Sequence, residues 1–320
     1  MENKSILITG GAGFIGSQFV RDAVSNDSYS RIYVMDKLTY AGDLNRIHLE
    51  IQHQNVEFIH DDINNANNYK SLFSEIDFLV HFAAESHVDR SINNGLPFLE
   101  TNIIGTYNLF EAAREFPAIK SLLVSTDEVY GSLYTDIADE NFNLNPASTY
   151  SASKASSELI ALALHQTFKQ NLCITRGCNT FGPFQDEEKL IPMAISRLIQ
   201  GKKVPLYGDG SNIREWLYVS DHVSAISKIL QLGKSGEIYN IGSNYRLSNL
   251  ELIKLLLKIL NLDESYIEFV EDRKGHDFRY ALNSSKIRNQ IVWEPKVDFL
   301  DGLRMTVNEV LKDKKIEKKL

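Results

Sequence analysis

Gly10-Gly11-Ala12-Gly13-Phe14-Ile15-Gly16 joins a short apolar run to a helical pattern, and this junction decides the fold. The run before it, Ser5-Ile6-Leu7-Ile8-Thr9, is rich in β-branched residues and predicts a strand. Residues 14–25 after it carry apolar side chains at three- and four-residue spacing, which predicts a helix. Glycines in such a turn let the backbone approach a ligand closely, and the N-terminus of the helix favours a phosphate group.

The same alternation continues through the first half of the chain. Helical patterns cover residues 97–116 and 149–170, and further β-branched runs predict strands at residues 31–36, 56–60, 78–82, 121–125 and 172–176. Alternating strands and helices are typical of an α/β protein, so we expect a doubly wound parallel sheet of the Rossmann type. The later pattern is turn-rich and predicts a second, smaller α/β substrate-binding domain. The expected boundaries are 1–176 for the first domain, with residues 216–241 returning to it, and 177–215 with 242–320 for the second.

The composition argues against several classes of function. The chain has 320 residues, 43% hydrophobic and 24% charged, with a formal net charge of -8. Nucleic-acid binding depends on many Lys and Arg contacts to phosphate, so we expect none here. No uncharged apolar stretch approaches the roughly 20 residues of a membrane span, and no signal segment precedes the first strand. With only two cysteines, Cys173 and Cys178, we expect a cytoplasmic protein without disulfides.

An acidic residue at the end of the second predicted strand points to a dinucleotide cofactor. Asp36 follows the glycine turn by about 20 residues, the position from which a carboxylate accepts hydrogen bonds from an adenosine ribose. A carboxylate there favours NAD over NADP, and the neighbouring Lys37 weakens that preference. Asp62-Ile63, after the third strand, is an expected contact to the adenine.

Tyr150 and Lys154 are four residues apart on a predicted helix, so both side chains lie on one face. A phenol titrates near pH 10 in water, so a base of this kind needs a nearby cation at neutral pH. We therefore expect these two residues to act together in proton transfer.

Thr126, Asp127 and Glu128 end another predicted strand, at the edge where a doubly wound sheet presents residues to a ligand. Successive strand residues point to opposite faces, so both carboxylates reach one substrate only if the backbone leaves the strand there. Gly131 is consistent with such a turn.

Further motifs carry a resemblance through nearly the whole chain. They are the stretches 10–17, 36–42, 83–91, 126–128, 150–154, 188–192, 212–219 and 275–280. Together they resemble the extended short-chain dehydrogenase/reductase family that modifies nucleotide sugars and, within it, the dTDP-glucose 4,6-dehydratases. The chain departs from the family's usual pattern at Thr149, at Lys274 and at residues 177–181.

The resemblance implies a lyase of deoxysugar biosynthesis that keeps NAD bound. The sugar is oxidised at C4, loses water across C5 and C6, and receives the hydride back at C6. Tyr150 would deprotonate the C4 hydroxyl, with Lys154 tuning it and Thr126 bonding the C4 oxygen. Glu128 would remove the C5 proton, which is acidic only beside a ketone, and a protonated Asp127 would donate to the departing C6 hydroxyl.

The resemblance also implies contacts and an assembly. The expected cofactor contacts are Gly10, Gly13, Phe14, Ile15, Gly16, Asp36, Lys37, Leu38, Thr39, Asp62, Ile63, Phe82, Ala83, Ala84, Ser86, Thr101, Tyr150, Lys154 and Thr180. The expected nucleotide-sugar contacts are Ser86, His87, Thr126, Asn179, Lys189, Leu190, Pro205, Leu206, Tyr207, Arg214, Asn240, Asp272, Arg273, His276 and Arg279. A homodimer would form through a four-helix contact of the helices at 97–116 and 149–170. No metal is expected.

Three alternatives stay open on the sequence. A nucleotide-sugar 4-epimerase would also use Tyr150, Lys154 and NAD, but it has no use for the Asp127 and Glu128 pair. A dehydratase acting on UDP- or CDP-glucose would use the same groups as one acting on dTDP-glucose. A cofactor-binding regulator would need the glycine turn and not the polar groups around it.

Overall fold

The computed structural model describes residues 4–313. Residues 1–3 and 314–320 lie outside the described part, and with them most of the lysine-rich run at residues 312–319. Within residues 4–313, no helix combines the length and the apolar character that crossing a bilayer requires.

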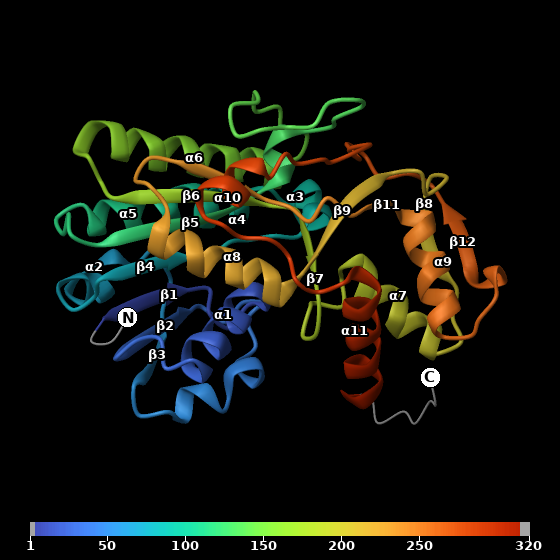
Figure 1. The fold of residues 1–320 in the computed structure, drawn as a ribbon, viewed down its shortest axis with the longest axis horizontal. Coiled ribbons are helices and arrows are strands. Elements are labelled where there is room, and N and C mark those ends of the chain that lie inside the picture. The colour runs from blue at the N-terminus through green and yellow to red at the C-terminus, as the bar shows by residue number, and fades with distance from the viewer. Residues whose placement is uncertain (1–3, 314–320) are drawn as a thin grey trace.

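A seven-stranded parallel sheet forms the centre of the larger lobe (Figure 1). The strand order is β10-β6-β5-β4-β1-β2-β3, which is the doubly wound arrangement expected from the sequence. Its strands are β1 (Ser5–Thr9), β2 (Arg31–Asp36), β3 (Val56–His60), β4 (Phe78–His81), β5 (Lys120–Thr126), β6 (Leu172–Gly177) and β10 (Ile238–Ile241). The six strands predicted for the first half are confirmed with small differences at their ends.

Helices cover both faces of this sheet, which explains why its strands are apolar throughout rather than alternating. Helices α1 (Phe14–Ser25) and α8 (Val219–Leu232) pack on one face, and α5 (Thr106–Ala113) and α6 (Thr149–Phe168) pack on the other. Ile6, Leu7 and Ile8 of β1 are fully buried between the two layers. The remaining short helices of this lobe are α2 (Ala66–Tyr69), α3 (Val88–Asn93), α4 (Leu96–Phe98) and 3₁₀ turns at Leu44–Ile47, Glu50–Gln52, Lys70–Ser74 and Asp127–Tyr130.

The helix predicted at residues 97–116 is present over residues 96–113, but its middle is π-helical rather than α-helical. A π-helical segment, Leu99–Gly105, separates α4 from α5. Within it Asn102 is buried, accepts a hydrogen bond from the Glu85 backbone N–H (2.8 Å) and donates to the Glu85 carbonyl (3.0 Å) and to Ser153 Oγ (2.8 Å). π-helical turns are typical of functional sites, and this one ties the helix to the loop after β4.

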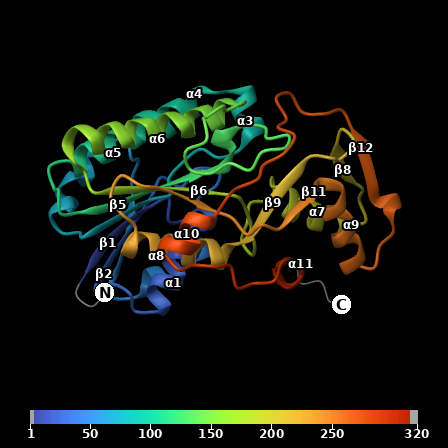
Figure 2. The same cartoon turned by 45° about the horizontal axis from the view of Figure 1, so that its top comes forward.

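The second lobe lies beyond the carboxyl ends of the central strands (Figure 2). Its elements are β7 (Asn179–Phe181), α7 (Leu190–Ile199), β8 (Val204–Tyr207), β9 (Ile213–Tyr218), β11 (Arg246–Ser248), α9 (Asn249–Ile259), a 3₁₀ turn at Glu264–Tyr266, β12 (Ile267–Val270) and α11 (Phe299–Asp313). Strands β11, β9 and β7 form one sheet, β12 pairs with β8, and the three helices share a separate apolar core.

The chain crosses between the lobes more than once. Helix α8 and strand β10 return to the central sheet. Helix α10 (Ser285–Gln290) also packs there, because Ile287, Ile291 and Trp293 belong to the apolar cluster under that sheet. The domain boundaries stay a prediction.

Candidate active site

In the glycine turn between β1 and α1, backbone atoms leave no room for a side chain at Gly10 or at Gly16. Gly10 has φ +70, and a Cβ there would lie 2.5 Å from the Ala83 backbone nitrogen. A Cβ on Gly16 would lie 2.2 Å from the Gly10 carbonyl oxygen. Helix α1 begins after Gly13 without a side-chain cap. Its first backbone N–H groups are therefore available to a pyrophosphate, which fits a dinucleotide.

Asp36 closes β2 beside this turn and is 9% exposed. Its Oδ2 accepts a hydrogen bond from the Ala12 N–H (2.9 Å) and its Oδ1 accepts one from the Leu38 N–H (2.8 Å). Burial raises the pKa of the Asp36 carboxyl, while these backbone donors act in the opposite sense. Lys37 pairs with Asp62 at 2.6 Å, so its charge is already partnered.

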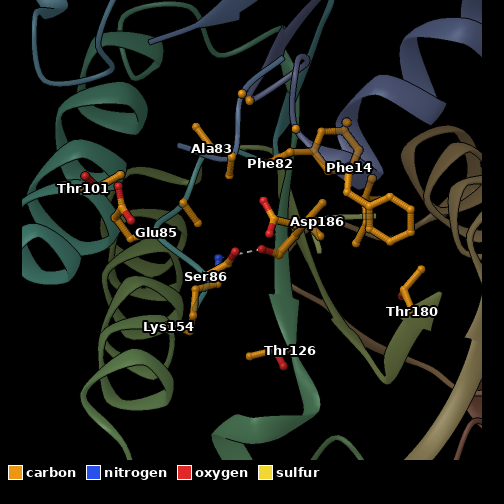
Figure 3. A pocket seen from close by; sticks show the side chains of 18 of the residues that line it. Phe14, Phe82, Ala83, Glu85, Ser86, Thr101, Thr126, Lys154, Thr180 and Asp186 are labelled. Atoms are coloured by element: carbon orange, nitrogen blue, oxygen red, sulfur yellow. Dashed lines mark hydrogen bonds between the residues drawn. The ribbon is translucent and has the colours of Figure 1, made fainter. Parts of the chain in front are cut away.

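One cavity brings most of the predicted cofactor contacts together. Of these residues, Leu38 alone does not line it, because its side chain packs against the core under the sheet. Figure 3 shows Glu85, Thr101 and Lys154 on one side of the cavity, with Phe14 and Thr180 across from them. Within residues 4–313, no cluster of three or more His, Cys, Asp or Glu side chains is placed to hold a metal.

Tyr150 and Lys154 both line this cavity from α6. A capping box of Ser148 and Ser151 starts the helix and so fixes its first turn. Lys154 Nζ donates to the Val124 carbonyl at 2.7 Å, and burial lowers its pKa to about 8. Burial and the nearby Glu128 charge raise the pKa of Tyr150. The lysine is therefore the cation that a tyrosinate would need.

The backbone leaves the strand after Thr126, as the sequence required for two carboxylates to face one cavity. Thr126 Oγ1 accepts from the Glu128 N–H at 3.2 Å and so starts the 3₁₀ turn Asp127–Tyr130. Gly131 ends the turn with φ +69, where a Cβ would lie 2.0 Å from the Asn145 carbonyl oxygen. Thr126, Asp127 and Glu128 consequently all line the cavity.

The two carboxyl groups have different surroundings. Asp127 is 3% exposed, and its Oδ2 has no hydrogen-bond partner among the described residues. Burial, followed by the charges of Glu128 and Glu215, raises its pKa well above 3.8. Burial also raises the pKa of Glu128, but Lys189 and Arg214 oppose that rise. The arrangement favours a protonated Asp127 beside an ionised Glu128.

Four of the predicted nucleotide-sugar contacts line the same cavity, namely Ser86, Thr126, Asn179 and Lys189. Lys189 Nζ donates to the Ser86 carbonyl at 2.9 Å, which joins the start of α7 to the loop after β4. His87, the next residue along that loop, lies 3.4 Å from the Glu188 carbonyl through Nε2 and does not line the cavity.

Arg214 lies on β9, outside the residues that line the cavity, and is 8% exposed. Its Nη1 donates to the Ile213 carbonyl (2.8 Å) and the Phe278 carbonyl (3.3 Å), its Nη2 donates to the Asp277 carbonyl (2.8 Å), and it stacks over Tyr280. These three bonds leave two of its five N–H groups for another acceptor.

A second group of predicted contacts gathers around Tyr207 at the end of β8. Arg273 lies over the Tyr207 ring at 5.3 Å and pairs with Asp89 at 2.9 Å. His276 Nδ1 contacts Asp272 Oδ1 at 2.7 Å, and its ring meets the Tyr207 ring edge-on. The four predicted residues therefore lie together, although they do not line the cavity.

The remaining five predicted contacts do not line the cavity either: Leu190, Pro205, Leu206, Asn240 and Arg279. Leu190 and Leu206 pack in or against the core of the second lobe. Asn240 is fully buried, accepts from Tyr130 Oη and donates to two carbonyls. Arg279 donates to the Asp136 carbonyl at 2.8 Å. For these residues the structure gives packing or backbone contacts.

Other lining residues were missed by sequence reasoning. They are Met35, Ala41, Gly42, Arg46, Asp61, Glu85, Val124, Ser125, Gly177, Cys178, Gln185, Asp186 and His222. Asp61, Glu85 and Gly177 lie at or just past strand ends, so the carboxyl-end rule could have found them. Arg46 and His222 sit in helical segments and carry no local signal of this kind.

Comparisons with known proteins agree with this geometry. A family model described as GDP-mannose 4,6 dehydratase matches residues 7–306. The low-salt glycan biosynthesis protein Agl12 of Haloferax volcanii is 45% identical over 96% of this chain and 99% of its own length. The dTDP-glucose 4,6-dehydratase of an Actinoplanes species is 45% identical over 94% of this chain and 96% of its own length.

A solved structure gives the same result. The dTDP-glucose 4,6-dehydratase of Streptomyces venezuelae, with NAD and TYD bound, is 43% identical and superposes with a TM-score of 0.94 over 97% of this chain and 98% of that one. On the family model and these relatives, the chain belongs to the nucleotide-sugar 4,6-dehydratase family that includes the dTDP-glucose 4,6-dehydratases.

Proposed function

We propose that this protein is an NAD-dependent hydro-lyase that converts dTDP-glucose to dTDP-4-keto-6-deoxyglucose. The observation that carries the proposal is the convergence of Asp127 and Glu128 with Tyr150 and Lys154 on the cavity that the glycine turn also lines. The names of the relatives support it, since several are dTDP-glucose 4,6-dehydratases and solved neighbours of that name hold NAD.

The glycine turn and Asp36 suit NAD, with the turn against its pyrophosphate and the carboxylate against its adenosine ribose. When bound, NAD would take up a hydride from C4 of the glucose and return it at C6, so the reaction has no net redox change. The chain's own groups would then carry every proton.

Tyr150 would accept the proton of the C4 hydroxyl while C4 becomes a ketone. Because burial raises the pKa of Tyr150, its tyrosinate depends on the cationic Lys154 four residues away. Thr126, at the end of β5, would hold the C4 oxygen.

Glu128 would remove the proton from C5, which is acidic only once the neighbouring C4 is a ketone. Asp127 would donate its proton to the C6 hydroxyl, so that the C6–O bond breaks and water leaves. The carbon–carbon double bond formed between C5 and C6 takes the hydride at C6 and a proton at C5. The contrast between the two carboxyl environments supports these opposite roles.

The nucleotide diphosphate would lie toward the second lobe. Lys189 in the cavity, and the N–H groups of Arg214 that the backbone carbonyls leave over, offer cations to a pyrophosphate. Tyr207, with Arg273 and His276 around it, offers an aromatic ring to a base.

We also propose a homodimer. Large apolar side chains are exposed on two helical stretches. Leu96 (59% exposed) and Ile104 (52%) lie on the stretch that runs from α4 through the π-helical segment, and Leu159 (58%) lies on α6. A four-helix contact between two copies would cover them. A charge introduced by Ile104→Glu should produce monomers in sedimentation analysis, whereas the same change at the exposed Val292 should not.

The proposed location is the cytoplasm. Cys173 and Cys178 are buried and unbridged, which suits a reducing compartment.

A nucleotide-sugar 4-epimerase is the second candidate, because the UDP-glucose 4-epimerase of Thermotoga maritima has the same fold at 28% identity and a TM-score of 0.89. An epimerase inverts C4 without losing water and so needs no acid and base at C5 and C6. Asp127 and Glu128 in the cavity therefore favour elimination.

The test is to incubate the purified protein with dTDP-, UDP- and CDP-glucose in separate reactions and to follow the product mass. The proposal expects a product lighter by one water, formed fastest from dTDP-glucose. A new sugar of unchanged mass, separated from the substrate by chromatography, would favour the epimerase. Faster turnover of UDP- or CDP-glucose would reassign the nucleotide.

A further inference from the structure

We propose that Glu158, Arg176 and Tyr130 form a buried bridge that positions the Asp127–Tyr130 turn against helix α6, and that this bridge sets the rate of the elimination half of the reaction. The inference rests on the proposed function. Because none of the three side chains lines the cavity, they are positioning residues.

Arg176 is the centre of the bridge. It lies on β6 between the other two side chains and is 3% exposed. Its Nε (2.9 Å) and Nη2 (2.7 Å) both donate to Glu158 Oε2. Its Nη1 donates to Tyr130 Oη (2.8 Å), and the guanidinium lies over the Tyr130 ring at 4.7 Å. A planar fork of donors is needed to hold both partners at once.

Tyr130 is the last residue of the turn that presents the two carboxyl groups. Its hydroxyl donates to Asn240 Oδ1 on β10 at 2.8 Å while it accepts from Arg176. The ring is 1% exposed and meets Phe142 edge-on. Both ends of the phenol are therefore held, and the turn that precedes it cannot shift without breaking one of these contacts.

Glu158 connects the bridge to the other half of the chemistry. It lies four residues after Lys154 and eight after Tyr150 on α6, so the three side chains share one side of the helix. Its charge also opposes the fall in the Lys154 pKa that burial causes. A buried ion pair is seldom more stabilising than well-packed apolar residues, so fixing geometry accounts better for this one than stability does.

The test is Tyr130→Phe, which keeps the ring and removes the hydroxyl between Arg176 and Asn240. We expect kcat to fall between about 10- and 100-fold, as misplaced catalytic groups do, with KM and bound NAD unchanged. The deuterium isotope effect for glucose labelled at C5 should increase and that for glucose labelled at C4 should decrease, because proton removal at C5 becomes rate-limiting.

Tyr239→Phe is the matched control. Tyr239 is also fully buried, and its hydroxyl loses one hydrogen bond, from the Lys234 N–H, where that of Tyr130 loses two. Tyr239 holds no part of the turn. It should leave both isotope effects as in the wild type. Should Tyr130→Phe fail to fold, Arg176→Lys replaces it, because lysine keeps the charge opposite Glu158 and cannot also hold Tyr130.

Unchanged kcat, or a fall in kcat with both isotope effects as in the wild type, overturns the inference. The wild-type protein separates this result from failure of the proposed function. If the wild type releases no water from any nucleotide glucose, the function itself fails before the variants are compared.

Discussion

Asp127→Asn separates the two halves of the proposed reaction. The surroundings of this carboxyl raise its pKa well above 3.8, which favours its protonated, neutral form. Asparagine has nearly the same shape and also carries a donor at that position. Since a neutral donor replaces a neutral donor, the free energy of unfolding should change by no more than about 1 kcal/mol below about pH 4, where the carboxyl is also protonated in the unfolded chain.

The effect on catalysis should be far larger. A positioned general acid contributes roughly 10²- to 10⁴-fold, which is about 2.7 to 5.5 kcal/mol in the barrier. Water loss should slow by that factor, because the amide cannot protonate the departing C6 hydroxyl. Oxidation at C4 should survive, because Tyr150 and Lys154 are unchanged.

The assay mixes enzyme and dTDP-glucose for a single turnover. The near-ultraviolet absorbance of the reduced nicotinamide should rise and persist in Asp127→Asn, and mass spectrometry should find little product lighter by one water. Product formation at the wild-type rate would refute the acid role of Asp127. Loss of the absorbance rise would refute the separation into two half-reactions.

The same substitution predicts a pH dependence of stability. A carboxyl whose pKa is raised on folding binds its proton more tightly in the folded state. Stability therefore falls as pH rises from the unfolded pKa through the folded one. Asp127→Asn removes this loss, so its melting temperature relative to wild type should increase with pH above about 4. A difference that is constant with pH would contradict the raised pKa.

Three further outcomes are expected. Gly16→Ala should lower the free energy of unfolding by about 1–3 kcal/mol and release NAD, because its Cβ would lie 2.2 Å from the Gly10 carbonyl oxygen. In Gly13→Ala the Cβ would lie 3.2 Å from the same oxygen, so this variant should lose less stability and less NAD in the same assays. The rate of water loss should fall on acidification at a pH above 4.5, because burial raises the pKa of Glu128. The residual rate of the Glu128→Gln variant should not show this acidic fall. Because the Lys154 pKa is about 8, the pH profile of the C4 oxidation rate should change slope near pH 8. The profile of the Lys154→Arg variant should show no such change.

The sequence predicted what short-range geometry determines. The strand-turn-helix around Gly10 and Gly16 and the one-turn spacing of Tyr150 and Lys154 follow from local periodicity, and both are present in the structure. The helix at residues 97–116 was also predicted, but its π-helical middle was not, and there Asn102 bonds to Glu85, 17 positions away.

The same limit explains the site residues that the cavity does not contain. The resemblance implied nucleotide contacts for Asn240 and Arg279, but Asn240 bonds to Tyr130 Oη and Arg279 bonds to the Asp136 carbonyl. Arg46 and His222 line the cavity without any local pattern, because packing of distant segments brings them there.

The sequence by itself determined the family, the parallel sheet and the residue types of the chemistry, because strand and helix periods and the glycine turn depend on neighbours within a few positions. Only the tertiary structure decided how the surroundings of the two carboxyls differ. Asp127 and Glu128 are adjacent in the chain, yet Glu215, Lys189 and Arg214 act on them from elsewhere in the fold. A pKa depends on burial and charge in space, and neither can be read from chain order.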